Sequence, residues 1–185
     1  SMRRVATVTI SVVSPLYSDD FSRTTLSPWV VYSGTWGVSN GALRGTNTAG
    51  YGLAYLPNSW TDYSVQASIQ FPAGAYGGGV GACLNTNTGA RYAAWIYQDA
   101  GGGVGTLKLL KFQSWEVFTE MQVASLPAVG TSAHTLKLAC VTNRLEVFFD
   151  GASKMSVVDT ETNRYSGGAI SADFWAAAAG YQMSV

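Results

Sequence analysis

The chain has 185 residues, a formal net charge of zero and only 12% charged residues, and it has no cluster of Lys and Arg that could bind nucleic-acid phosphates. No apolar run approaches the roughly 18 residues that cross a bilayer, and the length suits a single domain with a full hydrophobic core. Gly (21 residues) and aromatic residues (12%) dominate the composition, which suits binding of a neutral ligand and is also common in extracellular β-proteins for solubility alone.

Residues 1–16 are predicted to lie outside the main domain. Ser1-Met2 is typical of a tag remnant. Residues 5–13, VATVTISVV, form a β-branched run that ends before Pro15, which cannot continue a central strand. The run is similar to the last strand of immunoglobulin-like repeats in large bacterial surface proteins, which would make residues 1–16 a linker or an orphan strand from an upstream repeat. The alternative is an ordinary strand of the main domain, which is predicted to span residues 17–185.

The remaining chain reads as short alternating segments bounded by Gly, Asn, Ser or Pro, without a helical period of useful length. The clearest is an antiparallel meander that begins at His134. Its core residues Leu136, Leu138 and Cys140 alternate with polar or small ones, and Asp150-Gly151 is a tight-turn dipeptide. Strands are predicted at 36–38, 42–43, 63–71, 77–84, 91–97, 107–112, 115–123, 136–140, 145–149, 154–158, 169–172 and 179–185, with a break before residue 60.

About a dozen short strands at this spacing indicate an all-β sandwich or jelly roll. An ordered set of segments then resembles concanavalin A-like domains of the laminin-G-like type: DDFSRTTLSPW, WGVSNGALRG, WTDYSVQASI, GGGVGACL, RYAAWIY, HTLKLACVTNRLEVFFDG and YSGGAIS. The resemblance covers about residues 17–185. It implies a two-sheet antiparallel jelly roll with a concave face, found in bacterial secreted multidomain proteins, usually carbohydrate-binding or adhesive and often holding a structural calcium.

Catalysis is not predicted. Glucanases of related folds carry an E-x-D-x-E strand, and here Glu116 and Glu120 have the outer spacing while Phe118 replaces the central Asp. Four residues of extended strand would separate the two carboxylates by about 13 Å, beyond the roughly 5–9.5 Å that glycosidases use. His134, the one histidine, is predicted to be a strand-end residue without a nucleophile motif beside it.

The predicted ligand-binding residues are Arg91, Trp95 and Tyr97, which share one face of a strand, while Tyr92 and its alternates face the core. Aromatic rings stack on sugars, and planar polar side chains bind hydroxyl groups. Three further residues are expected to join them: Asp99, Trp115 and Tyr76. The alternative is that these rings pack under a loop.

For calcium the candidates are Asp19, Asp20 and Asp159, whose oxygen atoms are the right ligand type. The alternative is a solvated acidic pair, because the acidic residue expected in the last strand is absent from Gly180-Tyr181-Gln182-Met183. Cys83 and Cys140 could form one disulfide in a secreted protein or remain two buried thiols.

Together these features predict a non-catalytic, lectin-like module of an extracellular protein that binds a polysaccharide or other glycan and adjoins other domains of the same chain. A structural or adhesive spacer without a sugar site is the second interpretation, and a glycoside hydrolase is the third.

Overall fold

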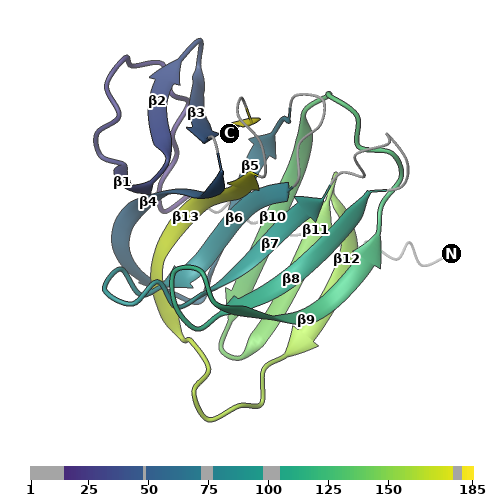
Figure 1. Cartoon of the computed structure of the whole chain (residues 1–185). Coiled ribbons are helices and arrows are strands. Elements are labelled where there is room, and N and C mark those ends of the chain that lie inside the picture. Colours follow the sequence, from purple (N-terminus) through teal and green to yellow (C-terminus); the bar gives the residue numbers. More distant parts are fainter. Residues whose placement is uncertain (1–14, 48, 72–76, 98–104, 177–180) are drawn as a thin grey trace, which may run out of the picture.

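A computed structural model describes residues 15–47, 49–71, 77–97, 105–176 and 181–185, which form a two-layer antiparallel β-sandwich (Figure 1). The front layer is a seven-stranded sheet in the order β1-β4-β13-β6-β7-β8-β9. The back layer combines a four-stranded sheet, β12-β11-β10-β5, with a three-stranded sheet, β14-β3-β2. The strands are β1 (Val30–Ser33), β2 (Thr35–Ser39), β3 (Ala42–Asn47), β4 (Gly50–Thr61), β5 (Tyr63–Ile69), β6 (Gly77–Leu84), β7 (Arg91–Tyr97), β8 (Thr106–Phe112), β9 (Phe118–Ser125), β10 (His134–Val141), β11 (Arg144–Phe149), β12 (Ala152–Val158), β13 (Gly167–Ala176) and β14 (Tyr181–Ser184).

This architecture confirms the all-β jelly-roll prediction, and period-two alternation explains how the core forms. In β10, Leu136, Leu138 and Cys140 are buried between the layers, as predicted. The turn at Asp150-Gly151 has positive φ at both residues, 48° and 77°, and joins β11 to β12. None of the described segments forms a helix of the length and apolarity needed to cross a bilayer.

Three strand predictions were wrong, and the first is the omission of β1. The break assigned before Trp60 is β4, a twelve-residue strand between β1 and β13. Its glycines hid it, and Gly52 has a packing reason: a Cβ there would lie 2.3 Å from the ring of Phe174. The strand predicted at 115–123 is β9, which begins at Phe118, so Trp115 lies in the loop before it and not in a strand.

The two cysteines face each other across the layers, Cys83 from β6 and Cys140 from β10. Both are free and buried, which matches the alternative of two buried thiols. A hydrogen bond between the two side chains lowers the pKa of Cys83 and raises that of Cys140. Beside them, the Tyr63 hydroxyl accepts the Cys83 N–H at 2.6 Å and donates to the Ala169 carbonyl at 2.9 Å. These two bonds connect β5 of the back layer to β6 and β13 of the front layer.

His134 begins β10, as predicted, and its ring is held between two acceptors. Nδ1 lies 2.8 Å from the Asp150 carboxylate and Nε2 lies 2.8 Å from the Val129 carbonyl oxygen. Burial alone would lower its pKa, but these two bonds raise it above the usual value. The doubly protonated ring satisfies both acceptors, so the protonated form is the one that stabilises the fold.

We therefore expect a pH-dependent contribution from His134. Because its folded-state pKa is raised, this contribution is fully present below the unfolded pKa of about 6.5 and is lost as pH rises through the folded value. The half-exposed partner Asp150 limits the effect to at most about 1 kcal/mol. Urea unfolding of the protein and of His134→Gln should show a larger difference at pH 5.5 than at pH 9. A difference that is constant across this range would contradict the assignment.

Candidate functional site

The candidate site is the front face, by which we mean the surface of the seven-stranded sheet that points away from the core. Alternation in β7 places Arg91, Trp95 and Tyr97 on this face and Tyr92 in the core side of the strand, as predicted. The neighbouring strands add, on the same face, Tyr51, Leu53 and Tyr55 from β4, Ser171, Asp173 and Trp175 from β13, and Lys108, Leu110 and Phe112 from β8.

A buried ion pair lies at the centre of this face. Arg91 Nη2 donates to Asp173 Oδ2 at 2.7 Å and Nε donates to the same oxygen at 3.2 Å. Trp95 Nε1 also donates to Oδ2, at 3.1 Å, while the Ser171 hydroxyl donates to Oδ1 at 3.0 Å. Both carboxylate oxygens of Asp173 are therefore occupied, and the charge is matched inside the protein.

Arg91 and Trp95 are themselves inaccessible, with 0% and 1% of their surface exposed. The guanidinium carbon of Arg91 lies 3.7 Å from the centre of the Phe112 ring, and its Nη1 donates to the Gly89 carbonyl at 2.9 Å. That these two side chains contact a ligand stays a prediction, and in this structure they are buried beneath the accessible surface. They form the foundation of the face, because their polar atoms already have protein partners.

The glycines of β6 leave room for side chains of the neighbouring strands to pack directly on its backbone. A Cβ at Gly81 would lie 2.2 Å from the Ser171 hydroxyl, and one at Gly77 would lie 2.8 Å from the Tyr97 ring. Side chains from the flanking strands β7 and β13 therefore cover the backbone of β6. Glycine at positions 77 and 81 is therefore required by this close packing.

The loop between β8 and β9 covers the ion pair. The Trp115 carbonyl accepts from Arg91 Nη1 at 3.3 Å, and the Glu116 carbonyl accepts from the Tyr51 hydroxyl at 3.3 Å. The Trp115 ring stacks on Tyr32 at 3.8 Å between centroids and 12° between planes, and it lies 6.1 Å from Tyr55. The loop thus brings Trp115 to the front face, as its inclusion among the predicted site residues requires.

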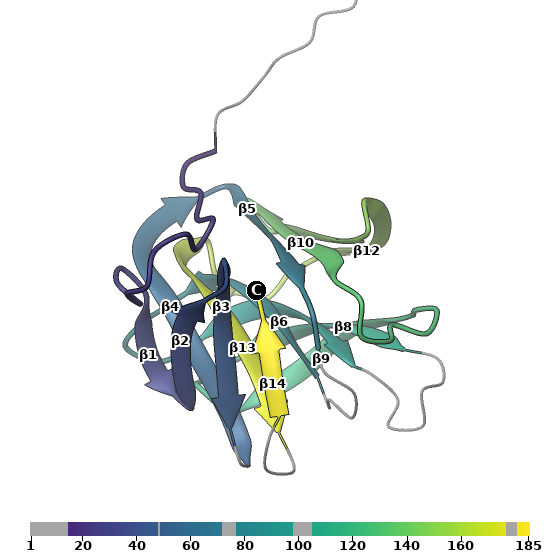
Figure 2. The same cartoon turned by 90° about the horizontal axis from the view of Figure 1, so that it is seen from above.

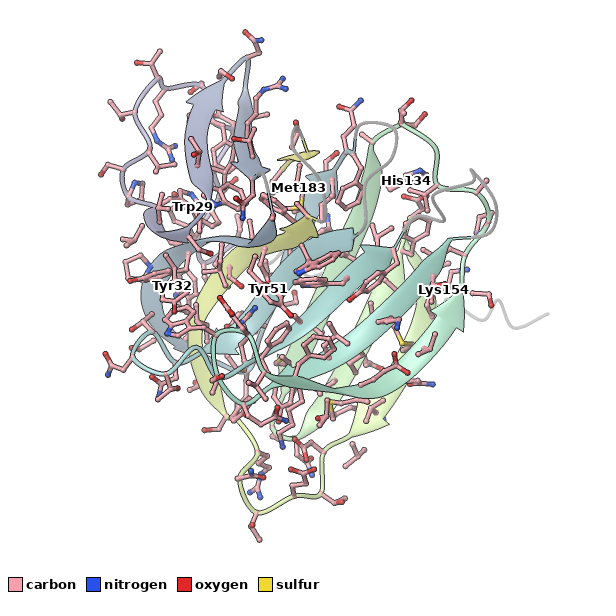
Figure 3. The ribbon with its side chains drawn as sticks, viewed as in Figure 1. Trp29, Tyr32, Tyr51, His134, Lys154 and Met183 are labelled. Carbon is pink, nitrogen blue, oxygen red and sulfur yellow. The ribbon has the colours of Figure 1, made fainter. Side chains whose placement is uncertain are left out.

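Above the foundation lies a set of partly accessible aromatic side chains, which we call the ring layer. It consists of Tyr32, Tyr51, Tyr55, Tyr97, Trp115 and Trp175. Tyr32 is 45% exposed and the others are half-buried. In Figure 3, Tyr51 projects over the sheet and Tyr32 lies toward the β1 edge. Burial is the main cause of the raised pKa values of Tyr51 and Tyr97, so both carry neutral hydroxyl groups at neutral pH.

Sequence reasoning missed four members of the ring layer. Tyr32, Tyr51 and Tyr55 belong to β1 and β4, which were not predicted, and Trp175 lies beyond the end of the predicted 169–172 strand. The alternation Tyr51, Leu53, Tyr55 was the available signal. The predicted site residues Tyr76 and Asp99 lie outside the described residues.

Two charged side chains on the accessible front face, Lys108 and Glu120, pair with each other. Lys108 Nζ lies 2.8 Å from Glu120 and 5.0 Å from the centre of the Tyr97 ring. Glu120 belongs to β9, four strands away from Asp173 in β13. At about 4.8 Å per strand that separation is about 19 Å along the sheet, twice the largest spacing of glycosidase carboxylates, roughly 9.5 Å.

The first two calcium candidates lie near the N-terminal end of the described chain. The Asp19 carboxylate accepts from the Tyr17 hydroxyl, from Trp29 Nε1 at 2.9 Å, and from Nη1 and Nη2 of Arg23. Burial alone would raise the pKa of Asp19, but the bonds from Arg23 and Trp29 hold it well below the usual range. Asp20 is exposed, and its carboxylate accepts the N–H of Ser22 at 3.0 Å.

The third candidate, Asp159, is buried elsewhere, against the front layer. Its carboxylate accepts from Lys111 Nζ at 2.7 Å and from the Tyr92 hydroxyl at 2.6 Å. Burial opposes these bonds, yet they keep the pKa of Asp159 below its usual value. No group of three acidic, His or Cys side chains with metal-binding geometry occurs among the described residues. The predicted set is therefore not assembled as one site, and calcium dependence stays a prediction to be measured.

Comparison with known proteins identifies the fold of this chain. No protein-family model matches the chain, and no curated protein matches it in sequence. Among solved structures, it is similar to carbohydrate-binding module CBM66 from Bacillus subtilis, with 17% identity and a TM-score of 0.70 over 86% of this chain and 91% of that one. It is also similar to a glycoside hydrolase family 16 endo-glucanase from Bacteroides ovatus, with 11% identity and a TM-score of 0.67 over 92% and 97% of the two chains.

A third similar structure is a Bacillus subtilis protein of unknown function with a galectin-like fold, with 11% identity and a TM-score of 0.66 over 91% of each chain. These likenesses establish a concanavalin A-like jelly roll, as the sequence resemblance implied. At such low identity they show the fold only, and the function has to be argued from the front face.

Proposed function

We propose that the protein is a non-catalytic carbohydrate-binding domain that holds a neutral glycan on the ring layer of the front face. The proposal rests on the arrangement of six partly accessible aromatic side chains above the buried ion pair of Arg91 and Asp173. Flat rings bind the C–H faces of sugars, and tyrosine hydroxyl groups add hydrogen bonds at the ring edge. A preorganised foundation keeps the ordering cost of binding low.

A neutral ligand is favoured by the charges. Asp173 is neutralised by Arg91 below the surface, and Lys108 is paired with Glu120 beside Tyr97. No uncompensated charge among these groups would attract a strongly acidic or basic polymer. The similarity to a carbohydrate-binding module and to an endo-glucanase supports a glycan as the ligand, and it also supports an extracellular setting.

The absence of catalysis is part of the proposal. A glycosidase needs one carboxyl group to protonate the leaving oxygen and a second to act as base or nucleophile, about 5–9.5 Å away. Asp173 is fully buried with both oxygens occupied, and Glu120 lies about four strand spacings from it. Neither group is therefore positioned to share one sugar bond with the other.

Affinity electrophoresis through gels containing soluble neutral polysaccharides, including β-1,3- and β-1,4-linked glucans, tests the proposal. We expect retardation by at least one glycan. Tyr32→Ala and Tyr97→Ala should each weaken it about tenfold, since losing one stacked ring costs about 1.4 kcal/mol. The same gels with calcium and with a chelator measure calcium dependence, and reducing-sugar release tests for hydrolysis.

Phe148→Ala is the matched control. Phe148 is a half-buried aromatic residue on the outer side of the back layer, where Lys137 Nζ lies 5.3 Å from its ring centre. It should leave retardation unchanged. If no polysaccharide retards the protein, or if all three variants behave alike, the domain is better explained as a spacer that works through contacts with neighbouring domains.

A further inference from the structure

A second buried ion pair, formed by Lys111 and Asp159, lies on the core side of the front layer, away from the ring layer. Lys111 belongs to β8, and Asp159 directly follows β12, a strand of the opposite layer (Figure 2). Lys111 Nζ lies 2.7 Å from Asp159 Oδ2, and only 2% of each side chain is exposed. The pair therefore connects the two layers at a place that solvent hardly reaches.

Neighbouring groups fix the Asp159 carboxylate against the amine. The Asp159 N–H donates to the Asn143 carbonyl oxygen at 2.8 Å, and Asp159 Oδ1 accepts the N–H of Glu161 at 2.9 Å. Oδ2 accepts from the Tyr92 hydroxyl at 2.6 Å and from Lys111. The two oxygens thus have different partners, because a backbone N–H holds Oδ1 while Oδ2 faces a hydroxyl donor and the amine.

A second carboxylate reaches the same amine. Glu161 Oε2 lies 2.8 Å from Lys111 Nζ, and 62% of the Glu161 side chain is exposed. The rings of Tyr92 and Tyr165 border Nζ, with their centres 5.9 and 5.2 Å away. The amine is therefore enclosed by aromatic rings and placed between a buried carboxylate and one that contacts water.

We propose that Lys111 and Asp159 condense to an intramolecular amide, which links β8 covalently to the end of β12. A bond forms between Lys111 Nζ and Asp159 Cγ, the bond from Cγ to Oδ2 breaks, and Oδ2 leaves as water. The ammonium group supplies both protons of that water and keeps one on the amide nitrogen. The charged pair becomes a neutral amide, so the reaction needs neither an oxidant nor another reactant.

The groups around the pair supply the proton transfers. Burial alone would favour a neutral amine and a neutral acid, but the hydrogen bonds of the cluster outweigh it, so the pKa of Lys111 is raised and that of Asp159 is lowered. The resting pair is therefore charged, and a proton must first pass from Nζ to Oδ2 along their hydrogen bond. After Nζ attacks Cγ, Glu161 takes the second proton from Nζ and delivers it to the leaving Oδ2.

Two donors stabilise the charge that develops during the attack. The negative charge builds on Asp159 Oδ1, which already accepts the N–H of Glu161. The Tyr92 hydroxyl donates to the leaving oxygen, and burial, followed by its bond to Asp159, raises its pKa, so it stays protonated. These contacts exist before the reaction, so the site needs no rearrangement to begin it.

Positioning and burial favour the amide over the ion pair. Well-oriented groups within one molecule reach effective molarities of about 10⁵–10⁸ M. The uncharged product also removes the desolvation cost of two buried ions. Lys108 and Glu120 supply an internal control, because Lys108 is also in β8 and the two groups meet at 2.8 Å, yet their side chains are 32% and 43% exposed. Those ions stay hydrated, and no amide is expected between them.

Mass spectrometry of the purified full chain tests the proposal, which does not depend on glycan binding. The denatured chain should weigh one water less than its sequence requires, and proteolysis should release a branched peptide that joins Lys111 to Asp159. Glu161→Gln should form the amide at least about tenfold more slowly, measured as the cross-linked fraction at equal times after expression, since the new side chain cannot accept the proton from Nζ. Lys111→Arg keeps the positive charge and should have its full mass.

A full mass for the unmodified protein would overturn the proposal. So would water loss that fragmentation places in a linear peptide at Asp150-Gly151, where the side chain can close a ring with the backbone. A branched peptide that joins Lys108 to Glu120 in equal yield would contradict the selection by burial. A Glu161→Gln protein that cross-links as fast as the unmodified one would overturn the role given to Glu161.

Discussion

Replacing Arg91 by Met should lower the free energy of unfolding by about 3–5 kcal/mol, because it leaves the Asp173 carboxylate buried without its cation. Both side chains are completely buried, and the pair is made by two bonds to one oxygen, at 2.7 and 3.2 Å. Urea unfolding followed by tryptophan fluorescence measures the change. The double variant Arg91→Met/Asp173→Leu should recover most of the loss, because apolar groups of similar size can replace a buried ion pair.

The Lys108 and Glu120 pair on the same sheet supplies a matched control. Its two side chains are 32% and 43% exposed, and its 2.8 Å separation resembles that of the buried pair. Lys108→Met should therefore cost less than about 1 kcal/mol. A small cost for Arg91→Met, accompanied by loss of glycan retardation, would reverse our assignment and restore Arg91 as a ligand-binding residue.

Local patterns were enough to predict much of the fold. The alternation in β7 and β10 identified both strands and separated their two faces, since each pattern depends only on neighbours in the chain. The turn at Asp150-Gly151 followed from the backbone preference of two residues. The strand β4 escaped because its glycines satisfy a distant requirement, the ring of Phe174, which no local pattern reveals.

The accessibility of the site could not be predicted in the same way. Arg91 and Trp95 were assigned to the correct face, but their burial depends on Asp173, 82 residues from Arg91 along the chain. It also depends on the Trp115 loop, which was predicted to be part of a strand. A sequence shows which residues share a face of a strand. Which of them is covered is decided by long-range packing, and this separates the foundation from the ring layer here.

Trp95 allows that separation to be tested. Its side chain contacts the rings of Tyr51, Tyr97 and Phe112 at centroid distances of 5.8 to 6.1 Å, and only 1% of its surface is exposed. Trp95→Ala should therefore cost about 3–5 kcal/mol of unfolding free energy, the range for emptying a large buried aromatic site. Thermal and urea unfolding both measure it, and the variant's glycan retardation is compared at a temperature where it is fully folded.

Trp95→Phe makes the test specific, because it keeps most of the buried volume and removes only the Nε1 bond to Asp173. The Asp173 carboxylate retains Arg91 and Ser171 as donors, so the cost should fall to about 1–2 kcal/mol, near that of a single hydrogen bond to a charged group. Retardation should stay within about twofold of the unmodified protein, since the ring layer is untouched, whereas Tyr97→Ala should lose about tenfold. A Trp95→Phe protein that is fully stable yet no longer retarded would mean that Trp95 reaches the glycan, and the ring layer would then have to include it.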